Sequence, residues 1–404
     1  MKRYRIDGLL CASEQTLPYP EAEGEPEVWL YRRQAEKSRA AFVPSAPGQL
    51  TAAEEGLTFL DARRTPDRLP EDVRGAVARR TLRAVNLAWP GWQTRLRAPE
   101  RPDRLRVHIA AMGDVGGTLA LGLRLCGGKT LSGIGLCDVN EKAAAHWEQE
   151  LGQARDCWGP AMPAVAIVPP ERVFDCDILV FAATKGVPPV GTFTGDARMA
   201  QLEANRGLVR LYARMAREKK FGGLFCVVSD PVDPLAREAF TASNADENGK
   251  FDGLGLLPEQ IQGFGLGVMH ARGAYYAEKD ARYADFLREG RAFGPHGTGL
   301  VLANSISRYD DERSRELTQL AIAANMKMRE LGYKPFVAPA ISSAALPILH
   351  AARGEWHDGS VFLGGAYFGC KNRNTPNGQE TECLELPDAL YARLEASYRE
   401  LLEL

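Results

Sequence analysis

The segment that most constrains the fold is a strand, a glycine-rich turn and a helix in direct succession. Residues 107–110 form an apolar run typical of a buried strand, and the turn at 111–117 reads Ala-Met-Gly-Asp-Val-Gly-Gly. Residues 119–125 then have the apolar character of a helix. Glycine lets the backbone turn sharply close to a ligand, and the N-terminus of the following helix stabilises negative charge. The succession predicts a site for the phosphates of a dinucleotide, although Ala111 occupies the first glycine position of the motif.

Asp138 supports this prediction because it lies 22 residues after Gly116, at the end of the next apolar run. A carboxylate there accepts hydrogen bonds from the adenosine ribose and repels a 2′-phosphate, which favours NAD over NADP. The alternative is that the glycines form only a tight turn and that Asp138 caps a helix at 140–151. The candidate cofactor contacts are Gly113, Asp114, Val115, Gly116, Asp138 and Ala183.

Short apolar runs alternate with helical stretches after residue 106, which is typical of a parallel sheet with crossover helices. The runs are 106–112, 133–137, 164–168, 177–183 and 223–229. Beyond residue 255 we expect longer helices at 263–290, 313–331 and 388–403, and a strand at 360–368. The predicted class is α/β, with a Rossmann-type doubly wound parallel sheet over 106–255 followed by an α+β catalytic domain over 256–404.

Residues 1–105 differ in character, being rich in Pro, Arg and Glu with weak periodicity. Their clearest element is an amphipathic helix expected at 71–87, where apolar residues recur at helical spacing after Pro70. Trp89 and Trp92 follow it. We expect an N-terminal extension or small subdomain that packs on the main body or on another subunit.

The composition is that of an ordinary globular protein, with 404 residues, 45% hydrophobic and 25% charged. A formal net charge of -2 gives no excess of positive field for nucleic acid or for an anionic membrane surface. Without an apolar run long enough for a signal peptide or a membrane span, we expect a cytoplasmic protein. The eight cysteines include no C-x-x-C pair, so neither a metal knuckle nor a disulfide framework is expected.

Four further motifs follow the glycine turn in a fixed order. They are the strand at 177–183 with Gly186-Val187-Pro188, then Ser229-Asp230-Pro231-Val232-Asp233, then His270-Ala271-Arg272, then Gly294-Pro295-His296-Gly297. Together with the turn and Asp138, this set resembles the lactate/malate dehydrogenase superfamily over residues 106–404. The resemblance implies an NAD-dependent oxidoreductase that acts on a small 2-hydroxy or 2-oxo acid, as a homodimer or homotetramer.

The resemblance also implies roles for individual side chains. His296 matches the acid/base that exchanges a proton with the substrate, a task suited to a group that titrates near neutral pH. Arg272 matches the planar clamp for the substrate carboxylate. A second arginine that polarises the carbonyl is expected after the fourth strand, where Arg198 is the best match and Arg206 the fallback.

Two positions depart from the family pattern. Met269 stands where a carboxylate usually orients the catalytic imidazole, and Asp230 stands where an asparagine usually donates to the substrate oxygen. Our hypothesis is that Asp230 supplies the carboxylate that Met269 lacks, so that Asp230→Ala costs at least as much activity as Arg272→Ala. The alternatives are that Asp230 receives an amino or imino substrate, or that dehydrogenase activity has been lost.

The loop at 189–194 offers no arginine for a second carboxylate, so malate is disfavoured as the substrate. A rival from another class is a non-catalytic NAD-binding sensor or scaffold, because a fold alone does not establish chemistry. NAD-dependent glycosidases also resemble this superfamily, but they need a metal held by Cys and His. The segment at 269–272 contains no cysteine, and we expect no metal.

Overall fold

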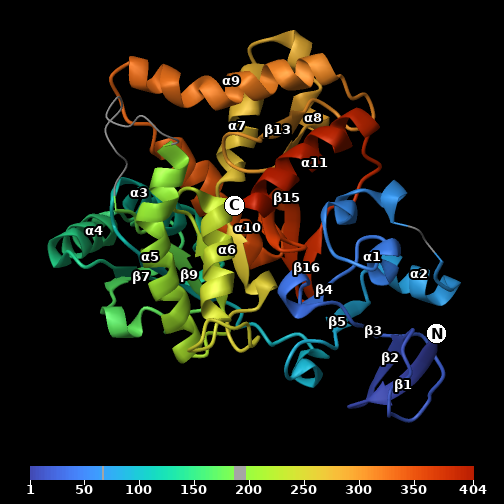
Figure 1. The fold of residues 1–404 in the computed structure, drawn as a ribbon. Coiled ribbons are helices and arrows are strands. Elements are labelled where there is room, and N and C mark those ends of the chain that lie inside the picture. The colour runs from blue at the N-terminus through green and yellow to red at the C-terminus, as the bar shows by residue number, and fades with distance from the viewer. Residues whose placement is uncertain (66–67, 186–196) are drawn as a thin grey trace.

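The computed structural model of this chain describes residues 1–65, 68–185 and 197–404, with the side chains of 197–199 left out. Its centre is a nine-stranded sheet with the strand order β16-β15-β14-β11-β10-β9-β6-β7-β8 (Figure 1). The strands are β6 (Leu105–Ala110), β7 (Leu131–Cys137), β8 (Ala164–Ile167), β9 (Ile178–Phe181), β10 (Leu224–Val227), β11 (Ile261–Gly263), β14 (His357–Leu363), β15 (Ala366–Thr375) and β16 (Gly378–Thr381).

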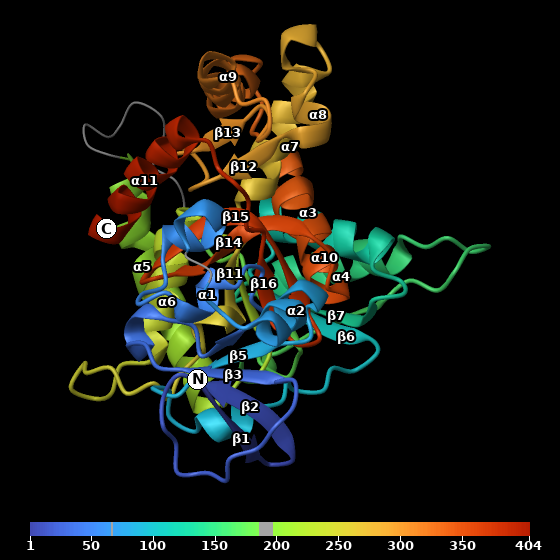
Figure 2. The same ribbon diagram turned by 90° about the vertical axis from the view of Figure 1, so that its right-hand side faces the viewer.

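Strands β6 to β11 are mutually parallel and, counted from β6, follow the order 3-2-1-4-5-6. This is the doubly wound Rossmann order, so the predicted fold class is confirmed. Figure 2 shows helices on both sides of the sheet. They are α3 (Asp114–Cys126) and α4 (Glu141–Gln153) on one side, and α5 (Ala197–Glu218) and α6 (Val232–Ser243) on the other.

The antiparallel strands β14, β15 and β16 continue the same sheet past β11. The predicted domain boundary at 255 therefore falls within the sheet, one strand before its parallel part ends. The prediction of a single strand at 360–368 was wrong. The segment is a hairpin, because Gly364 and Gly365 take positive φ values between β14 and β15 and reverse the chain.

The second half of the chain contributes five further helices. They are α7 (Leu266–Ala277), α8 (Phe286–Glu289), α9 (Asp311–Glu330), α10 (Leu346–Arg353) and α11 (Asp388–Glu403), and a π-helix (Pro339–Ala345) precedes α10. Helices α7, α8 and α9 lie at the top of Figure 1, while α10 packs against α3, β14 and β15. The helix predicted at 388–403 is confirmed and that at 313–331 nearly so. The single helix predicted at 263–290 was wrong, because the chain breaks after Ala277 and Asp280 caps a separate turn by accepting from the Arg282 N–H.

The first hundred residues contain a five-stranded sheet of order β1-β2-β3-β5-β4. Its elements are β1 (Lys2–Ile6), β2 (Leu9–Ser13), β3 (Val28–Tyr31), β4 (Ala41–Phe42), β5 (Arg83–Asn86), α1 (Gly48–Thr51) and α2 (Glu71–Arg79). The predicted helix at 71–87 was too long, because Arg80 takes a left-handed conformation (φ 60°) and the chain continues as β5. Val85 belongs to this strand, and Leu82 and Leu87 flank it.

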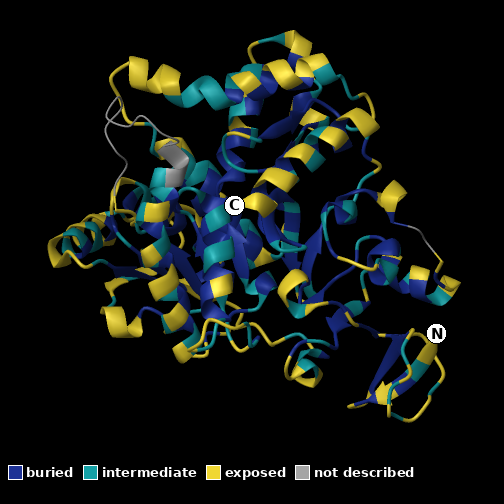
Figure 3. Cartoon of the chain, in the orientation of Figure 1, coloured by how far each residue is buried: buried dark blue, intermediate teal, exposed yellow. Residues whose placement is uncertain are grey.

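This N-terminal sheet packs on the C-terminal half of the chain. The Val43 N–H donates to the Gln379 carbonyl at 2.9 Å, which ties the end of β4 to β16. One apolar core joins Trp29, Phe42 and Phe59 to Phe368 and Leu394, and it lies in the buried interior of Figure 3. A fully buried ion pair between Arg39 and Glu55 (2.5 Å) lies in the same region.

The hairpin of β12 (Arg291–Phe293) and β13 (Val301–Ala303) forms a small sheet of its own. Its register pairs Phe293 with Val301, so that residues 294–300 form the connecting loop. This loop carries His296. None of the described helices combines the length and the apolar character that a membrane span requires.

Candidate functional site

A cavity of about 230 Å³ gathers three of the four predicted catalytic residues. Asp230 comes from the loop between β10 and α6, Arg272 from α7, and His296 from the loop between β12 and β13. The other lining residues are Gln201, Pro231, Met269, Gly297, Ile322 and Asn325. Asp230 follows a parallel strand at its carboxyl end, which is where ligands bind in open α/β sheets.

The His296 imidazole faces the carboxylate of Asp230. The distance from His296 Nδ1 to Asp230 Oδ1 is 3.2 Å, and the exposed fractions of the two side chains are 15% and 46%. A carboxylate at this distance favours the tautomer with the proton on Nδ1. The hypothesis that Asp230 takes over from the missing acid at Met269 gains geometric support.

The hydrogen-bond partners of Arg272 are uncharged, although the Asp230 carboxylate lines the same cavity. Its Nη1 lies 3.3 Å from the Met269 sulfur, and its Nη2 donates to the Asn325 side-chain oxygen. Among the residues that the structure describes, no carboxylate lies within ion-pair distance of this guanidinium. Burial lowers the pKa of Arg272, although arginine stays protonated in proteins. An anion entering the cavity would therefore meet a partly desolvated cation that has no anionic partner among the described residues.

The predicted second arginine cannot be placed. Arg198 lies in the first turn of α5, three residues before the cavity-lining Gln201, but its side chain is outside the described residues. The loop from Gly186 onward, on which the substrate prediction rested, is outside them as well. Arg206 pairs with the carboxylates of Glu203 and Glu238 and does not line the cavity.

The glycine turn is closely packed at one glycine and open at another. A Cβ on Gly116 would lie 2.0 Å from the Ala111 carbonyl oxygen, so this position accepts only glycine, whereas a Cβ on Gly113 would meet nothing within 4 Å. Gly113 is also the N-cap of α3 and offers no side-chain cap. The first N–H groups of α3 thus border open space at the positive end of the helix dipole. Ala111 itself takes φ 80°, the left-handed region that favours glycine.

Asp114 and Asp138 flank this turn. The Asp138 carboxylate accepts from the Met112 N–H at 2.6 Å and from the Asn140 N–H at 2.8 Å, which fixes the end of β7 against the turn. The residue that caps α4 is Asn140, which accepts from the Lys142 N–H. The Asp114 carboxylate lies 3.5 Å from Lys334 Nζ.

The two remaining cofactor candidates are Val115 in α3 and Ala183 after β9. Val115 packs against the apolar core below α3, and the Ala183 carbonyl accepts from the Ser229 hydroxyl at 2.7 Å beyond the end of β9. Their contacts to a cofactor stay a prediction.

A second carboxylate lies buried next to the cavity. Asp233, in the first turn of α6, is 3% exposed and accepts a hydrogen bond from the Ser360 hydroxyl. Burial raises the pKa of Asp233 to about 6, and His296 opposes this rise. The segment Asp230-Pro231-Val232-Asp233 therefore places one carboxylate in the cavity wall and one in the core behind it.

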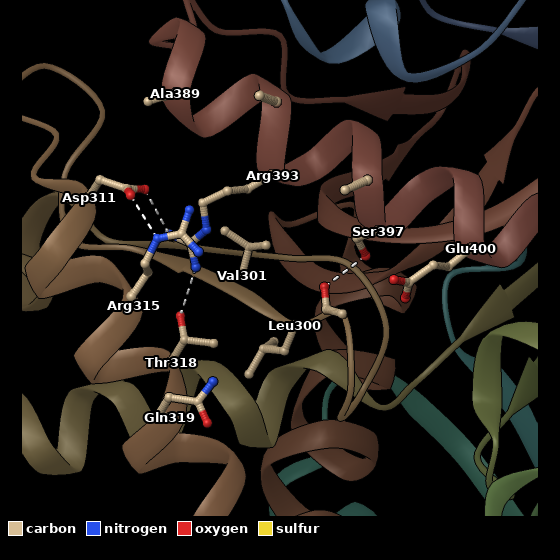
Figure 4. Close-up of a pocket in the computed structure, with 13 residues that line it drawn as sticks. Leu300, Val301, Asp311, Arg315, Thr318, Gln319, Ala389, Arg393, Ser397 and Glu400 are labelled. Atoms are coloured by element: carbon tan, nitrogen blue, oxygen red, sulfur yellow. Dashed lines mark hydrogen bonds and ion pairs between the residues drawn. The ribbon is translucent and has the colours of Figure 1, made fainter. Parts of the chain in front are cut away.

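A larger hollow of about 820 Å³ lies between α9 and α11 (Figure 4). Its apolar lining includes Leu300 and Val301, and Arg393 bonds there to the hydroxyls of Ser314 and Tyr309. None of the predicted site residues lines it. We assign the functional site to the smaller cavity because the acid/base pair and the arginine meet there.

Three lining residues of the smaller cavity were not predicted from the sequence. They are Gln201 on α5 and Ile322 and Asn325 on α9. Ile322 and Asn325 are three positions apart and share one face of the helix. No local motif marks them, because α9 approaches Arg272 only through the tertiary fold.

Comparison with known proteins agrees with this architecture. No family model matches the chain. The L-lactate dehydrogenase of Treponema denticola is 26% identical over 211 residues, which are 52% of this chain and 61% of that protein. The chain thus aligns with about three fifths of the length of this curated relative.

Solved structures with a similar fold cover about three quarters of the chain. A lactate dehydrogenase from a Medee basin deep-sea metagenome library covers 75% of this chain and 98% of its own, with 17% identity and a TM-score of 0.59. The minor L-lactate dehydrogenase of Enterococcus mundtii covers 74% and 97%, with 19% identity and a TM-score of 0.59. The malate dehydrogenase of Archaeoglobus fulgidus, solved with NADH, covers 74% and 97%, with 19% identity and a TM-score of 0.60. At identities this low, the structural matches show a shared fold.

Proposed function

We propose that this chain is a divergent member of the lactate/malate dehydrogenase superfamily and an NAD-dependent oxidoreductase acting on a small 2-hydroxy or 2-oxo acid. The observation that carries the proposal is the cavity in which Arg272, His296 and Asp230 meet. An anion clamp and a carboxylate-paired imidazole in one small cavity suit proton exchange with the hydroxyl or carbonyl oxygen on the carbon next to a carboxylate.

Arg272 binds and orients the acid in this proposal. Its guanidinium fork matches a carboxylate in a bidentate arrangement, and its two described partners, Met269 and Asn325, are neutral. Binding of the substrate carboxylate therefore neutralises a cation that the described part of the fold leaves without an anionic partner.

His296 moves the proton. With Nδ1 held by Asp230, its Nε2 is the atom that takes the proton from a 2-hydroxy group during oxidation and returns it to the carbonyl oxygen during reduction. Asp230 acts as a positioning residue that fixes the tautomer and stabilises the imidazolium formed during oxidation.

The residues around the glycine turn would hold NAD. Gly113, Gly116 and the first N–H groups of α3 fit the pyrophosphate, and Asp138 fits the adenosine ribose. When bound, NAD supplies or accepts the hydride. The open space above Gly113 supports this assignment.

The test is a panel of 2-oxo acids, with and without amines, followed by NADH absorbance. Arg272→Ala is expected to raise KM on the order of 100-fold through loss of a charge-assisted pair, and His296→Ala to abolish turnover. Arg315→Ala and His350→Ala, which alter exposed or half-exposed groups away from the cavity, are the matched controls. Tight NAD binding without turnover on any acid would instead indicate the sensor. Turnover that needs an amine would indicate that Asp230 receives an imino substrate.

A further inference from the structure

Two uncharged amides line the cavity in addition to the groups that the proposed chemistry uses. Asp230, His296 and Arg272 serve the reacting carbon and its carboxylate. Gln201 on α5 has no part in that chemistry, and Asn325 on α9 contacts Arg272 only through its side-chain oxygen. Met269 and Ile322, which also line the cavity, are apolar. The amides therefore face the part of the substrate that extends beyond the reacting carbon.

The orientation of the Asn325 amide follows from its partner. Arginine only donates hydrogen bonds, so Arg272 can pair only with the side-chain oxygen of Asn325. The Asn325 NH₂ group points away from the guanidinium, and no described residue accepts from it. Two donor hydrogens in the cavity wall are thus available to a ligand that carries an acceptor.

Gln201 offers both a donor and an acceptor. No hydrogen bond joins its amide to any residue in the described parts of the chain. A partly enclosed amide without a partner favours a ligand that supplies one, since an unmet polar group costs about 1–3 kcal/mol, or about 5- to 150-fold in affinity.

We propose that Gln201 and Asn325 select a substrate whose short side chain carries an uncharged hydrogen-bonding group, either a hydroxyl or a carboxamide. This inference rests on the proposed function and specifies its substrate class. Arg272 is the one cation among the described lining residues, and it binds the first carboxylate, so a second carboxylate finds no counter-charge there. A cavity of about 230 Å³ holds roughly eight non-hydrogen atoms, which leaves room for a side chain of roughly three beyond the 2-oxo acid core.

Two isosteric pairs of substrates test the inference on the unaltered protein. Hydroxypyruvate and 2-oxobutyrate differ by a hydroxyl in place of a methyl group, and 2-oxosuccinamate and oxaloacetate by an amide in place of a carboxylate. We expect kcat/KM with NADH to be at least about tenfold higher for the first member of each pair. The apolar analogue leaves the amides unpaired, and the charged analogue brings a second carboxylate that no further cation among the described lining residues balances.

Variants then assign the preference to the two amides. Gln201→Leu and Asn325→Leu are expected to reduce the ratio of kcat/KM between hydroxypyruvate and 2-oxobutyrate by about fivefold or more. Gln319→Leu is the control, since it makes the same change on an exposed face of α9 outside this cavity.

The results separate failure of the inference from failure of the proposed function. Turnover of 2-oxobutyrate or oxaloacetate as efficient as that of its polar partner would overturn the inference and leave the dehydrogenase standing. A ratio unchanged in both leucine variants would overturn the assignment to Gln201 and Asn325. Absence of turnover on all four acids, with NAD bound, would reject the dehydrogenase and the inference with it.

Discussion

Asp230→Asn tests whether this carboxylate orients the acid/base. The substitution keeps the size of the side chain and removes its charge, 3.2 Å from His296 Nδ1. A charge-assisted hydrogen bond contributes about 1.5–3 kcal/mol, and because the Asp230 side chain is 46% exposed we take the lower part of that range, about 1.5–2 kcal/mol. This corresponds to a loss of about 10- to 30-fold in kcat. Oxidation of a 2-hydroxy acid, followed by NADH absorbance, is the direct assay, because the imidazolium forms in that direction.

A second substitution, at position 269, tests the same role of Asp230. Asparagine is the usual residue of the superfamily at position 230, so the expected loss arises only because Met269 provides no carboxylate. Adding Met269→Asp to Asp230→Asn is expected to restore part of kcat, whereas Met269→Asp alone adds a second carboxylate close to Arg272 and weakens acid binding. An Asp230→Asn protein that oxidises the acid at the wild-type rate would refute the assigned role of Asp230.

Three further predictions concern stability and are measured by urea unfolding. Ala111→Gly is expected to raise the free energy of unfolding by roughly 0.5–1 kcal/mol. Glycine removes the strain of the left-handed backbone at φ 80°, and the greater entropy of the unfolded glycine chain offsets part of this gain. A destabilised variant would contradict the prediction. Glu55→Gln leaves the buried Arg39 charge unpaired and is expected to cost about 3–5 kcal/mol, so a loss below about 1 kcal/mol would count against the buried pair. The pKa of Asp233 is raised by burial to about 6 from an ordinary 3.8, so the folded wild type binds the extra proton and loses stability as pH rises from 4 to 7. Asp233→Asn can still accept the hydrogen bond from Ser360 but does not titrate. Its free energy of unfolding relative to that of the wild type should rise by up to roughly 3 kcal/mol between pH 4 and pH 7. A difference in unfolding free energy that does not change with pH would exclude the raised pKa.

Much of the central fold could be predicted because its signals are local. The glycine turn, Asp138 and the buried strands are each encoded within a few residues, and the strand order follows from the βαβ succession. The N-terminal sheet could not, because its strands are short and pair with partners far along the chain. Arg80 shows the difficulty, since helical spacing continues past it while the backbone turns left-handed.

The candidate site divides in the same way. Arg272 and His296 occur in short motifs, whereas Asn325 reaches the cavity only because α9 packs on α7. The pairing of Asp230 with His296 joins positions 66 apart. The lack of an acid at position 269 suggested that another carboxylate compensates for it. The distance from Asp230 to the imidazole could not be predicted, because it is set by the path of the loop between β12 and β13.

The shared core of the two ends of the chain has a consequence for biosynthesis. Trp29 and Phe59 pack in one cluster with Leu394 and Leu401. Residues 29–59 are synthesised long before residues 394–401, so their apolar side chains stay uncovered until α11 has been made, and contacts of such long sequence separation form slowly. During that interval the nascent strands expose apolar surface, which favours aggregation of the unfinished chain.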